Sequence, residues 1–282
     1  MKLNRLNAII YIPDDEKVNI AIARTTHMCI AAHHDDIEIM AYDGILKCYQ
    51  DEQNWFFGVV VTNGSGSART GSYTHYTDQM MMEIRKEEQI KAAKIGRYGA
   101  LAMLDYSSAE TKDPQNTIII NELSELIQKA QPHTLYTHNF ADKHDTHIGV
   151  AVKVIHAIRQ LSSSERPKKL YGCEVWRGLD WMLDDEKFAF DASGHPELAQ
   201  ALVEVFDSQI AGGKRYDHAT IGRRLANATY DTSHKVDQSN QLIYAMDLTP
   251  LILDDQLDII QYVTAYIDRF KSDVIQKISK MT

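Results

Sequence analysis

Two short segments of the chain carry histidines and carboxylates at spacings that suit a divalent metal ion. The first, AHHDDIE at 32–38, places His33 three residues before Asp36, so one turn of chain can aim both side chains at a single point. Asp35 then projects elsewhere and is free to act as a base. Imidazole and carboxylate groups together suit Zn²⁺.

The second segment, DKHDTH at 142–147, offers the same chemistry. His144 and His147 stand three residues apart where a helix is expected to begin. For either segment alone the simpler interpretation is a set of solvated loop and cap residues, because Asp and Thr are common helix N-caps and a single His is usually structural. Two such segments in one chain favour a shared metal site.

Both segments follow predicted β-strands. The predicted strands of this region are apolar runs at 25–32, 55–62, 101–106 and 133–138. The predicted helices of this region lie at 37–50, 78–95, 116–130 and 147–161. Their alternation predicts an α/β fold with a Rossmann-like, mostly parallel sheet and helices on both faces. Ligands of such sheets bind beyond the carboxyl ends of the strands, where both segments lie.

The chain is interpreted as a single α/β domain, 1–282. Its motif-bearing core is 25–161, and a looser C-terminal part, 170–282, follows the polar segment 162–169. In that part, strands are predicted at 170–177, 187–191 and 242–246, and helices at 196–210, 214–228 and 256–279. The polar stretch 63–77 is predicted to be a long loop, and such loops in compact domains are often functional.

Composition excludes several classes of protein. With 44% hydrophobic and 24% charged residues, the chain has the composition of a soluble globular protein, and no apolar run is long enough for a membrane span. Its net charge of -9 would repel phosphate backbones, so no nucleic-acid partner is expected. No signal peptide is recognised at the N-terminus, and three scattered cysteines do not form a disulfide framework, so a reducing cytoplasm is the expected location.

The two segments together resemble the signature motifs of the PIG-L/LmbE-like family of zinc-dependent N-acetylglucosamine-type deacetylases. The segment 32–38 is similar to the family's Ala-His-Pro-Asp-Asp-x-Glu motif, and 142–147 is similar to its Asp-x-His-Pro-Asp-His element. Between them, 85–88 resembles the family's Arg-x-x-Glu helix, and 59–64 resembles its strand ending in Thr-x-Gly. The order and spacing of these motifs make the resemblance specific.

The resemblance implies a hydrolase that removes the acetyl group from an N-acetylated amino sugar or glycoconjugate. It implies His33, Asp36 and His147 as the zinc ligands and Asp35 as the general base. Three protein ligands leave a fourth position on the zinc for water, and the metal lowers the pKa of that water to about 7. Asp35 would take its proton as the water attacks the amide carbonyl.

Two further residues receive roles from the same resemblance. His144 would stabilise the oxyanion or protonate the leaving amine, and Arg85 would reach the sugar or the aglycone of the substrate. The expected cofactor is Zn²⁺, and the expected partner is a small-molecule amino-sugar substrate. Tyrosine-rich helices and a long C-terminal helix also allow a homo-oligomer.

The sequence departs from the family's motifs at two positions. His34 stands where the family has Pro, and Thr146 stands where it has an Asp that pairs with the catalytic His; Asp142 or Asp145 is left to compensate. Because of these departures, a sugar- or nucleotide-binding module without catalytic activity stays an alternative function. A metal-dependent esterase or deacylase acting on a non-sugar amide is the enzymatic alternative. For His138, structural and supporting roles at the metal site stay equally open.

Overall fold

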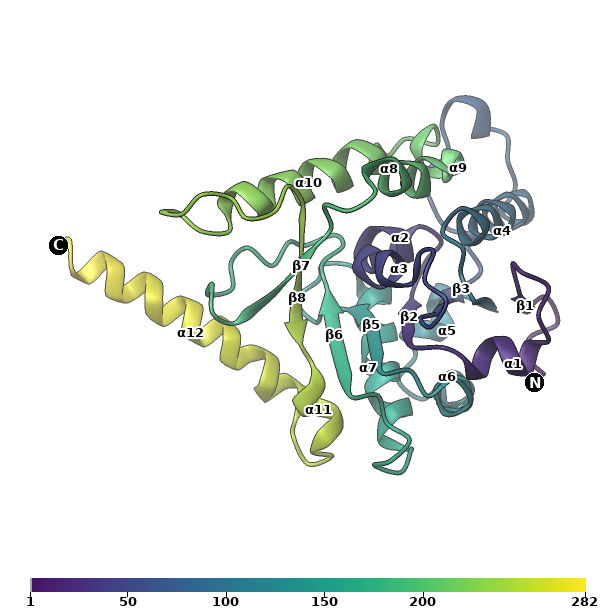
Figure 1. The fold of residues 1–282 in the computed structure, drawn as a ribbon, viewed down its shortest axis with the longest axis horizontal. Coiled ribbons are helices and arrows are strands. Elements are labelled where there is room, and N and C mark those ends of the chain that lie inside the picture. The colour runs from purple at the N-terminus through teal and green to yellow at the C-terminus, as the bar shows by residue number, and fades with distance from the viewer. Residues whose placement is uncertain (1) are drawn as a thin grey trace.

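The predicted alternation of strands and helices is present in the computed structural model, which describes residues 2–282 (Figure 1). The strands are β1 (Ile9–Tyr11), β2 (His27–Ala31), β3 (Phe56–Thr62), β4 (Ala100–Tyr106), β5 (Thr134–His138), β6 (Lys169–Cys173), β7 (Lys187–Asp191) and β8 (Leu242–Asp247). They form one eight-stranded sheet in the order β1-β4-β3-β2-β5-β6-β8-β7. The five central strands are parallel, whereas β1 at one edge and β8 and β7 at the other pair antiparallel. The predicted α/β fold is confirmed.

The α-helices lie on both faces of this sheet. They are α1 (Val18–Ala23), α2 (Asp36–Met40), α3 (Tyr42–Cys48), α4 (Asp78–Ile95), α5 (Ser108–Lys112), α6 (Thr117–Ala130), α7 (Asp145–Arg159), α8 (Pro196–Glu204), α9 (Asp207–Ile210), α10 (Tyr216–Tyr230), α11 (Thr249–Leu253) and α12 (Ile259–Ser279). A 3₁₀ turn, Gly71–Tyr73, interrupts the long loop 63–77.

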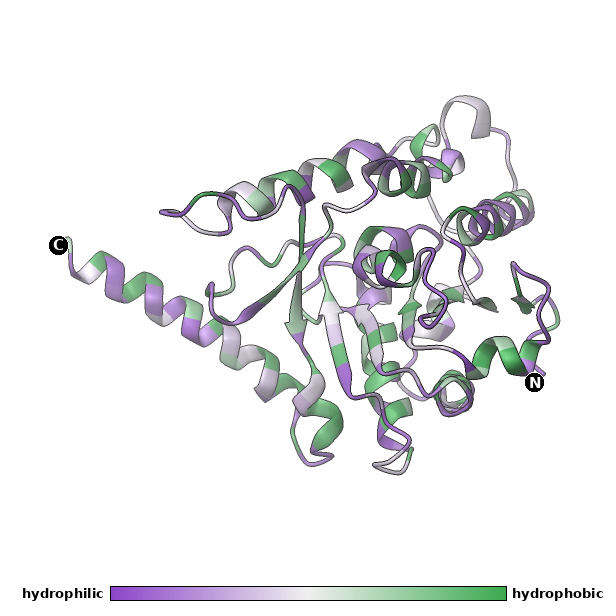
Figure 2. Cartoon of the chain, viewed as in Figure 1, coloured by the Kyte–Doolittle hydropathy of each residue, from purple (hydrophilic) through white to green (hydrophobic). Residues whose placement is uncertain are grey.

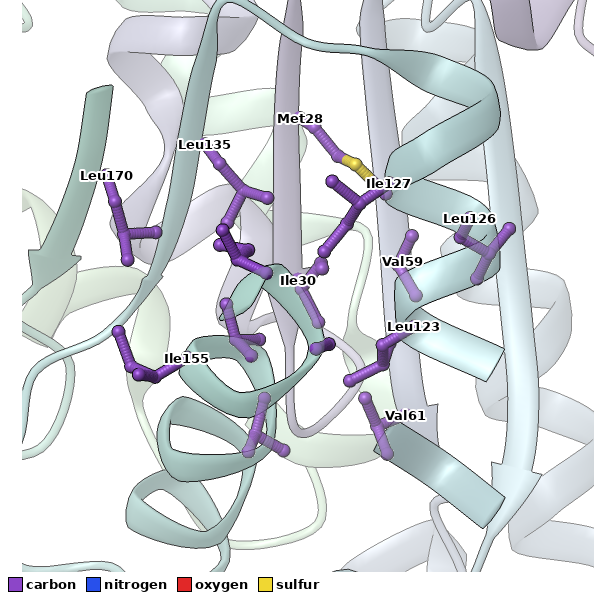
Figure 3. Packing of buried hydrophobic residues seen from close by; sticks show 14 of the residues in the cluster. Met28, Ile30, Val59, Val61, Leu123, Leu126, Ile127, Leu135, Ile155 and Leu170 are labelled. Carbon is purple, nitrogen blue, oxygen red and sulfur yellow. The ribbon is translucent and has the colours of Figure 1, made fainter. Parts of the chain in front are cut away.

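Side chains that alternate along the central strands build a separate core on each face of the sheet. Met28 and Ile30 of β2 pack with residues of α6 and α7, such as Leu123 and Ile155 (Figure 3). Cys29, between them, belongs to the core on the opposite face, with α2, α3, α4 and α8. Because successive side chains of a strand point to opposite faces, an uninterrupted apolar run is what a central strand needs.

The chain reverses its direction across the sheet between β2 and β5. From β2 it adds β3 and then β4 on one side, and it later returns to place β5 and β6 on the other side. The strands β2 and β5 are parallel neighbours, with Cys29 opposite Tyr136. Such a switch point opens a crevice beyond the carboxyl ends of the two strands.

Several predicted elements have different bounds in the structure. The predicted helix 37–50 is two helices, α2 and α3, because the backbone leaves helical geometry at Ala41 (φ −112°, ψ 24°). The carbonyls of Glu38 and Ile39, freed by this break, accept hydrogen bonds from Arg224. Likewise 196–210 is divided into α8 and α9 at 205–206, and the strand predicted at 170–177 ends at Cys173.

The long C-terminal helix α12 projects from the edge of the fold that carries β7 and β8 (Figure 1). Its middle is held by contacts to the segment before β7, where Arg269 pairs with Glu186 and the ring of Phe270 lies 6.1 Å from that of Trp181. Hydrophilic and hydrophobic residues alternate along it (Figure 2). Within residues 2–282, no helix is both long enough and apolar enough to cross a membrane.

Candidate active site

The switch point of the sheet brings the two histidine-containing segments together. The segment with His33 follows β2 directly, and the segment with His147 follows β5. The ends of these strands are joined by His138, the last residue of β5, whose Nε2 accepts a hydrogen bond of 2.8 Å from the backbone N–H of Ala32. This bond joins residues more than 100 positions apart in the sequence and brings the two segments to the same place.

The turn between β2 and α2 sends two successive carboxylates to different places. Asp35 has a left-handed backbone with φ of 91°, an uncommon conformation for a residue with a side chain. The Asp36 carboxylate turns back, and its Oδ2 accepts the backbone N–H of His33 at 2.7 Å. Asp35 and Asp36 both line a cavity.

Three ligand atoms form a small triangle at this point. His33 Nδ1 lies 3.1 Å from Asp36 Oδ2 and 3.1 Å from His147 Nε2, and these last two atoms are 3.3 Å apart. A tetrahedral zinc with bonds of about 2.0–2.1 Å would hold its ligand atoms about 3.3 Å from each other. The donor set and its spacing therefore fit a zinc ion.

A carboxylate behind the triangle orients His147. Asp142 Oδ2 lies 3.0 Å from His147 Nδ1, and the carboxylate also accepts the backbone N–H groups of Lys143, Trp176 and Arg177. With Nδ1–H donated to Asp142, His147 presents the lone pair of Nε2 to the triangle, as metal-bound histidines commonly do. Asp142, which the sequence suggested as a partner for His144, thus contacts His147.

Two other histidines lie close to the same point but use a ring nitrogen elsewhere. His138 belongs to a compact group with Asp36 and His147, yet its Nε2 is taken by the N–H of Ala32, which suits a supporting role. The ring of His144 lies 4.8 Å from that of His33 and 4.6 Å from that of His147. Because His144 Nδ1 accepts the N–H of Thr146 at 3.3 Å, its Nε2 is left to carry a proton.

Burial and neighbouring charges shift the pKa values of the titratable groups around the triangle. Burial, with Asp36 next to it, raises the pKa of Asp35 well above its usual range. Burial would also raise the pKa of Asp36, but His147 and His138 together hold it well below its usual range. Burial would lower the pKa of His147, but Asp36 and Asp142 raise it to about 9. Burial, followed by the nearby His33, lowers the pKa of His144 to about 4.

A cavity of about 630 Å³ opens next to this group, and Asp35, Asp36, His33 and His144 form one part of its lining. Trp176, after β6, forms another part: its ring lies 6.3 Å from that of His144 and 6.0 Å from that of Tyr216 at the start of α10. The cavity is large enough for a small-molecule ligand.

Arg85 lies at the cavity, but the structure gives its guanidinium donors other partners. The side chain is buried, and its Nη1 donates to the carbonyls of Gly64 and Gly66 at 2.5 and 2.9 Å, while Nη2 donates to the Ser67 hydroxyl. Arg85 therefore fastens the first part of the loop 63–77 to α4. Its direct contact with a substrate stays a prediction.

The two departures from the family motifs have clear places in the structure. His34 is buried next to Gly64, and a Cβ added at Gly64 would lie 2.9 Å from His34 Nδ1. Within residues 2–282, His34 is outside the groups of side chains whose spacing suits a metal ion. Thr146 contributes its backbone N–H to His144. Asp145 is exposed.

Sequence reasoning did not find the contacts that attach α9 to α4 and to the turn after β2. Glu88 of α4 accepts the N–H and the hydroxyl of Ser208 at 2.7 and 2.6 Å, and Gln209 donates to the carbonyl of His34 at 2.6 Å. These bonds join residues at least 120 positions apart. The motifs at 32–38, 59–64, 85–88 and 142–147 include neither Ser208-Gln209 nor any residue of α10.

Comparison with known proteins agrees with this geometry. Residues 28–158 match the model of the PIG-L family, described as GlcNAc-PI de-N-acetylase. No curated protein sequence matches the chain. The match covers β2 through α7 and therefore both histidine-containing segments.

Solved structures with a similar fold come from several organisms. The N,N'-diacetylchitobiose deacetylase of Pyrococcus horikoshii has a TM-score of 0.63 at 15% identity, with 86% of this chain and 90% of that chain covered. A conserved protein of Thermus thermophilus, TT1542, has a TM-score of 0.60 at 15% identity, covering 83% and 99%. GalB of Pseudomonas putida KT2440, a 4-carboxy-2-hydroxymuconate hydratase, has a TM-score of 0.61 at 14% identity, covering 79% and 96%. At these identities the similarity establishes the fold, and a hydratase on the same fold means that the reaction must be argued from the site.

Proposed function

We propose, from the match of residues 28–158 to the PIG-L family model, that the protein is a zinc-dependent hydrolase that removes the acetyl group from an N-acetylated amino sugar or glycoconjugate. The observation that carries the proposal is the triangle of His33, Asp36 and His147, whose ligand atoms lie 3.1–3.3 Å apart beside a cavity. Three protein ligands with an open fourth position are typical of catalytic zinc sites.

Each remaining residue of the site has a chemical task in this proposal. Bound Zn²⁺ would act as a Lewis acid on the acyl oxygen and would make water at the open position more acidic. Asp35 removes the proton from the attacking water, and its place on the cavity wall supports this role. His144 uses its Nε2–H to stabilise the oxyanion, and the proton that Asp35 took from the water passes to the leaving amine. Asp142 keeps His147 oriented.

Two substitutions separate metal binding from proton transfer. Asp35→Asn is expected to keep the metal content and to lower acetate release at least about 100-fold, because it removes the base and none of the three ligands. His147→Ala is expected to lose both the metal and the activity. Metal analysis of the purified variants and acetate release measure these outcomes. An Asp35→Asn variant empty of metal contradicts the assignment of Asp35 as base.

Removal of the metal tests the proposal more broadly. Treatment with a chelator is expected to abolish acetate release, and added Zn²⁺ is expected to restore it. Equal release with and without the chelator contradicts zinc dependence. A panel of N-acetylated sugars, non-sugar amides and acyl esters tests the substrate class, since preferred hydrolysis of a non-sugar amide or an ester would replace the amino-sugar proposal.

A further inference from the structure

The lining of the cavity holds acidic and basic groups from different segments, although the chain as a whole is acidic, with a net charge of -9. At the strand ends, the lining holds Asp35 and Asp36. Besides Arg85 and Lys112, four basic residues of the segment 214–224 line the cavity: Lys214, Arg215, Arg223 and Arg224. We name this group the cationic wall. Composition alone does not predict such a concentration of positive charge in an acidic chain.

Arg224 is the most deeply buried member of the cationic wall, with 2% of its surface exposed. Its Nη2 donates to the carbonyls of Glu38 and Ile39 at 2.8 and 3.1 Å, and the ring of Tyr42 lies 4.8 Å from its guanidinium carbon. Its Nε and Nη1 have no hydrogen-bond partner within residues 2–282. Unpaired donors on a buried cation are costly, so a cavity-lining Arg224 favours an acceptor supplied by a ligand.

The other members of the wall are also largely free of neutralising carboxylates. Arg223 donates to the carbonyls of Val175 and Trp176, and Lys214 lies 5.2 Å from the centre of the Trp176 ring. Among the ion pairs formed by residues 2–282, only that of Arg215 with Asp217, at 2.6 Å, involves the wall.

One further carboxylate, that of Glu174, also lines the cavity. Its oxygens already accept the backbone N–H groups of Leu179 and Tyr244 and the side-chain amide of Asn227. Glu174 offsets part of the charge of Arg223 and Arg224, but the four basic residues outnumber Glu174 and Asp217, so the wall keeps a net positive charge. The ring of Trp176, which touches both the wall and His144, places this charge within reach of a small substrate bound at the metal site.

We propose that the cationic wall binds an anionic group, a carboxylate or a phosphate, on the amine-side part of the substrate, while the acyl group lies at His33 and Asp35. This inference rests on the proposed function, because that function places the reacting amide at the strand ends. It narrows the substrate to an N-acylated amine that carries a negative charge away from the amide. Guanidinium groups suit such anions because their paired N–H donors match carboxylate and phosphate oxygens.

Three matched substrates test this inference: methyl N-acetylglucosaminide, which is neutral, N-acetylglucosamine 1-phosphate, and an N-acetylglucosamine glycoside ending in a carboxylate. We expect kcat/KM for at least one charged substrate to exceed that for the neutral one at least about tenfold, as a charge-assisted contact allows. The two charged substrates distinguish phosphate from carboxylate recognition. Equal kcat/KM for all three overturns the inference and leaves the proposed deacetylation intact.

Substitutions test whether the preference for charged substrates comes from the cationic wall. Arg224→Gln and Lys214→Met are expected to lower the ratio of charged to neutral kcat/KM about five- to tenfold, as loss of a charged contact would. Lys271→Met removes an exposed charge from α12, away from the cavity, and is expected to keep the ratio. Because Arg224 also holds the end of α2, Lys214→Met provides the comparison if Arg224→Gln does not fold. An unchanged ratio in every folded wall variant contradicts the inference.

A binding measurement keeps this inference independent of catalysis. Calorimetric titration of the metal-free protein with N-acetylglucosamine 1-phosphate, the carboxylate glycoside and methyl N-acetylglucosaminide compares their affinities without turnover. Tighter binding of a charged sugar, weakened by Lys214→Met, supports the cationic wall even if no amide is cleaved. Equal affinities for charged and neutral sugars overturn it.

Discussion

The two sides of the cavity are built in opposite ways. At the strand ends, His147 lies 3.3 Å from Asp36 Oδ2 and 3.0 Å from Asp142 Oδ2, so the imidazole and the two carboxylates interact favourably. On the cationic wall, Arg223 and Arg224 donate to carbonyls, and two donors of Arg224 stay unpaired within the part of the chain that the structure describes. In the proposed function the first side would hold the metal and move protons, and in the further inference the second side would bind the negative charge of the substrate.

The sides also differ in how the fold supports them. The strand ends belong to β2 and β5, which lie in the middle of the sheet and are packed on both faces. The cationic wall belongs to α10 and the residues before it, which are attached through Ser208 and Gln209. In the proposed function, the residues of the reaction and those of substrate selection therefore come from different segments of the chain, which contact each other where Arg224 bonds to the end of α2.

Asp142→Asn is expected to give the largest effect among the tests of this comparison. The change weakens the acceptor that orients His147, and loss of such a supporting contact typically lowers metal affinity about 10–100-fold. Competition with a fluorescent zinc chelator measures the affinity. Asp145→Asn, which alters an exposed aspartate three residues away, is the matched control and is expected to bind metal normally. Unchanged affinity in Asp142→Asn would show that His147 needs no such support.

Arg85→Met tests whether Arg85 holds the loop 63–77, part of which lines the cavity. Loss of the bonds to Gly64, Gly66 and Ser67 is expected to speed proteolysis within 63–77 and to lower kcat/KM, each about tenfold, as the loss of charged hydrogen bonds allows. Lys86→Met removes a charge from the same turn of α4 and serves as the control. A higher KM without faster proteolysis would instead indicate that Arg85 contacts the substrate directly.

Ser208→Ala tests the attachment of the cationic wall. The substitution removes the hydroxyl that donates to Glu88 and leaves a buried carboxylate oxygen without that partner, at a cost of about 1–2 kcal/mol of unfolding free energy. Thermal unfolding is expected to shift downward by a few degrees, whereas the metal content stays the same. Ser233→Ala, at an exposed position, is the control. Loss of metal in Ser208→Ala would show that the two sides are not separable.

Ionic strength is expected to have the smallest effect on kcat/KM and to act only on recognition by the cationic wall. Raising the ionic strength from about 0.02 to about 0.5 M is expected to lower kcat/KM for N-acetylglucosamine 1-phosphate about two- to fivefold, because exposed charges such as Lys214 are screened. The neutral glucosaminide is the internal control, since it has no charge to be screened. The same salt dependence for both substrates would contradict electrostatic recognition by the wall.

Local patterns in the sequence were sufficient for the central elements. The apolar runs predicted at 25–32, 55–62 and 133–138 correspond to β2, β3 and β5, and the helix predicted at 78–95 is α4. The spacing of His33 and Asp36 also indicated their contact, because three residues are one turn. Short elements were missed: β1 has three residues and is defined by its antiparallel pairing with β4, about 90 positions away in the chain.

The sequence alone determined which groups are available for chemistry, in what order they occur, and that an alternating α/β chain would place them at strand ends. Tertiary structure decided that β2 and β5 are neighbours, that Asp142 contacts His147 rather than His144, that Arg85 holds a loop, and that Arg224 replaces the missing helical bonds of α2. The reason is physical. Spacing along the chain governs contacts within one turn or one strand, whereas contacts between distant segments depend on how the whole sheet and its helices pack.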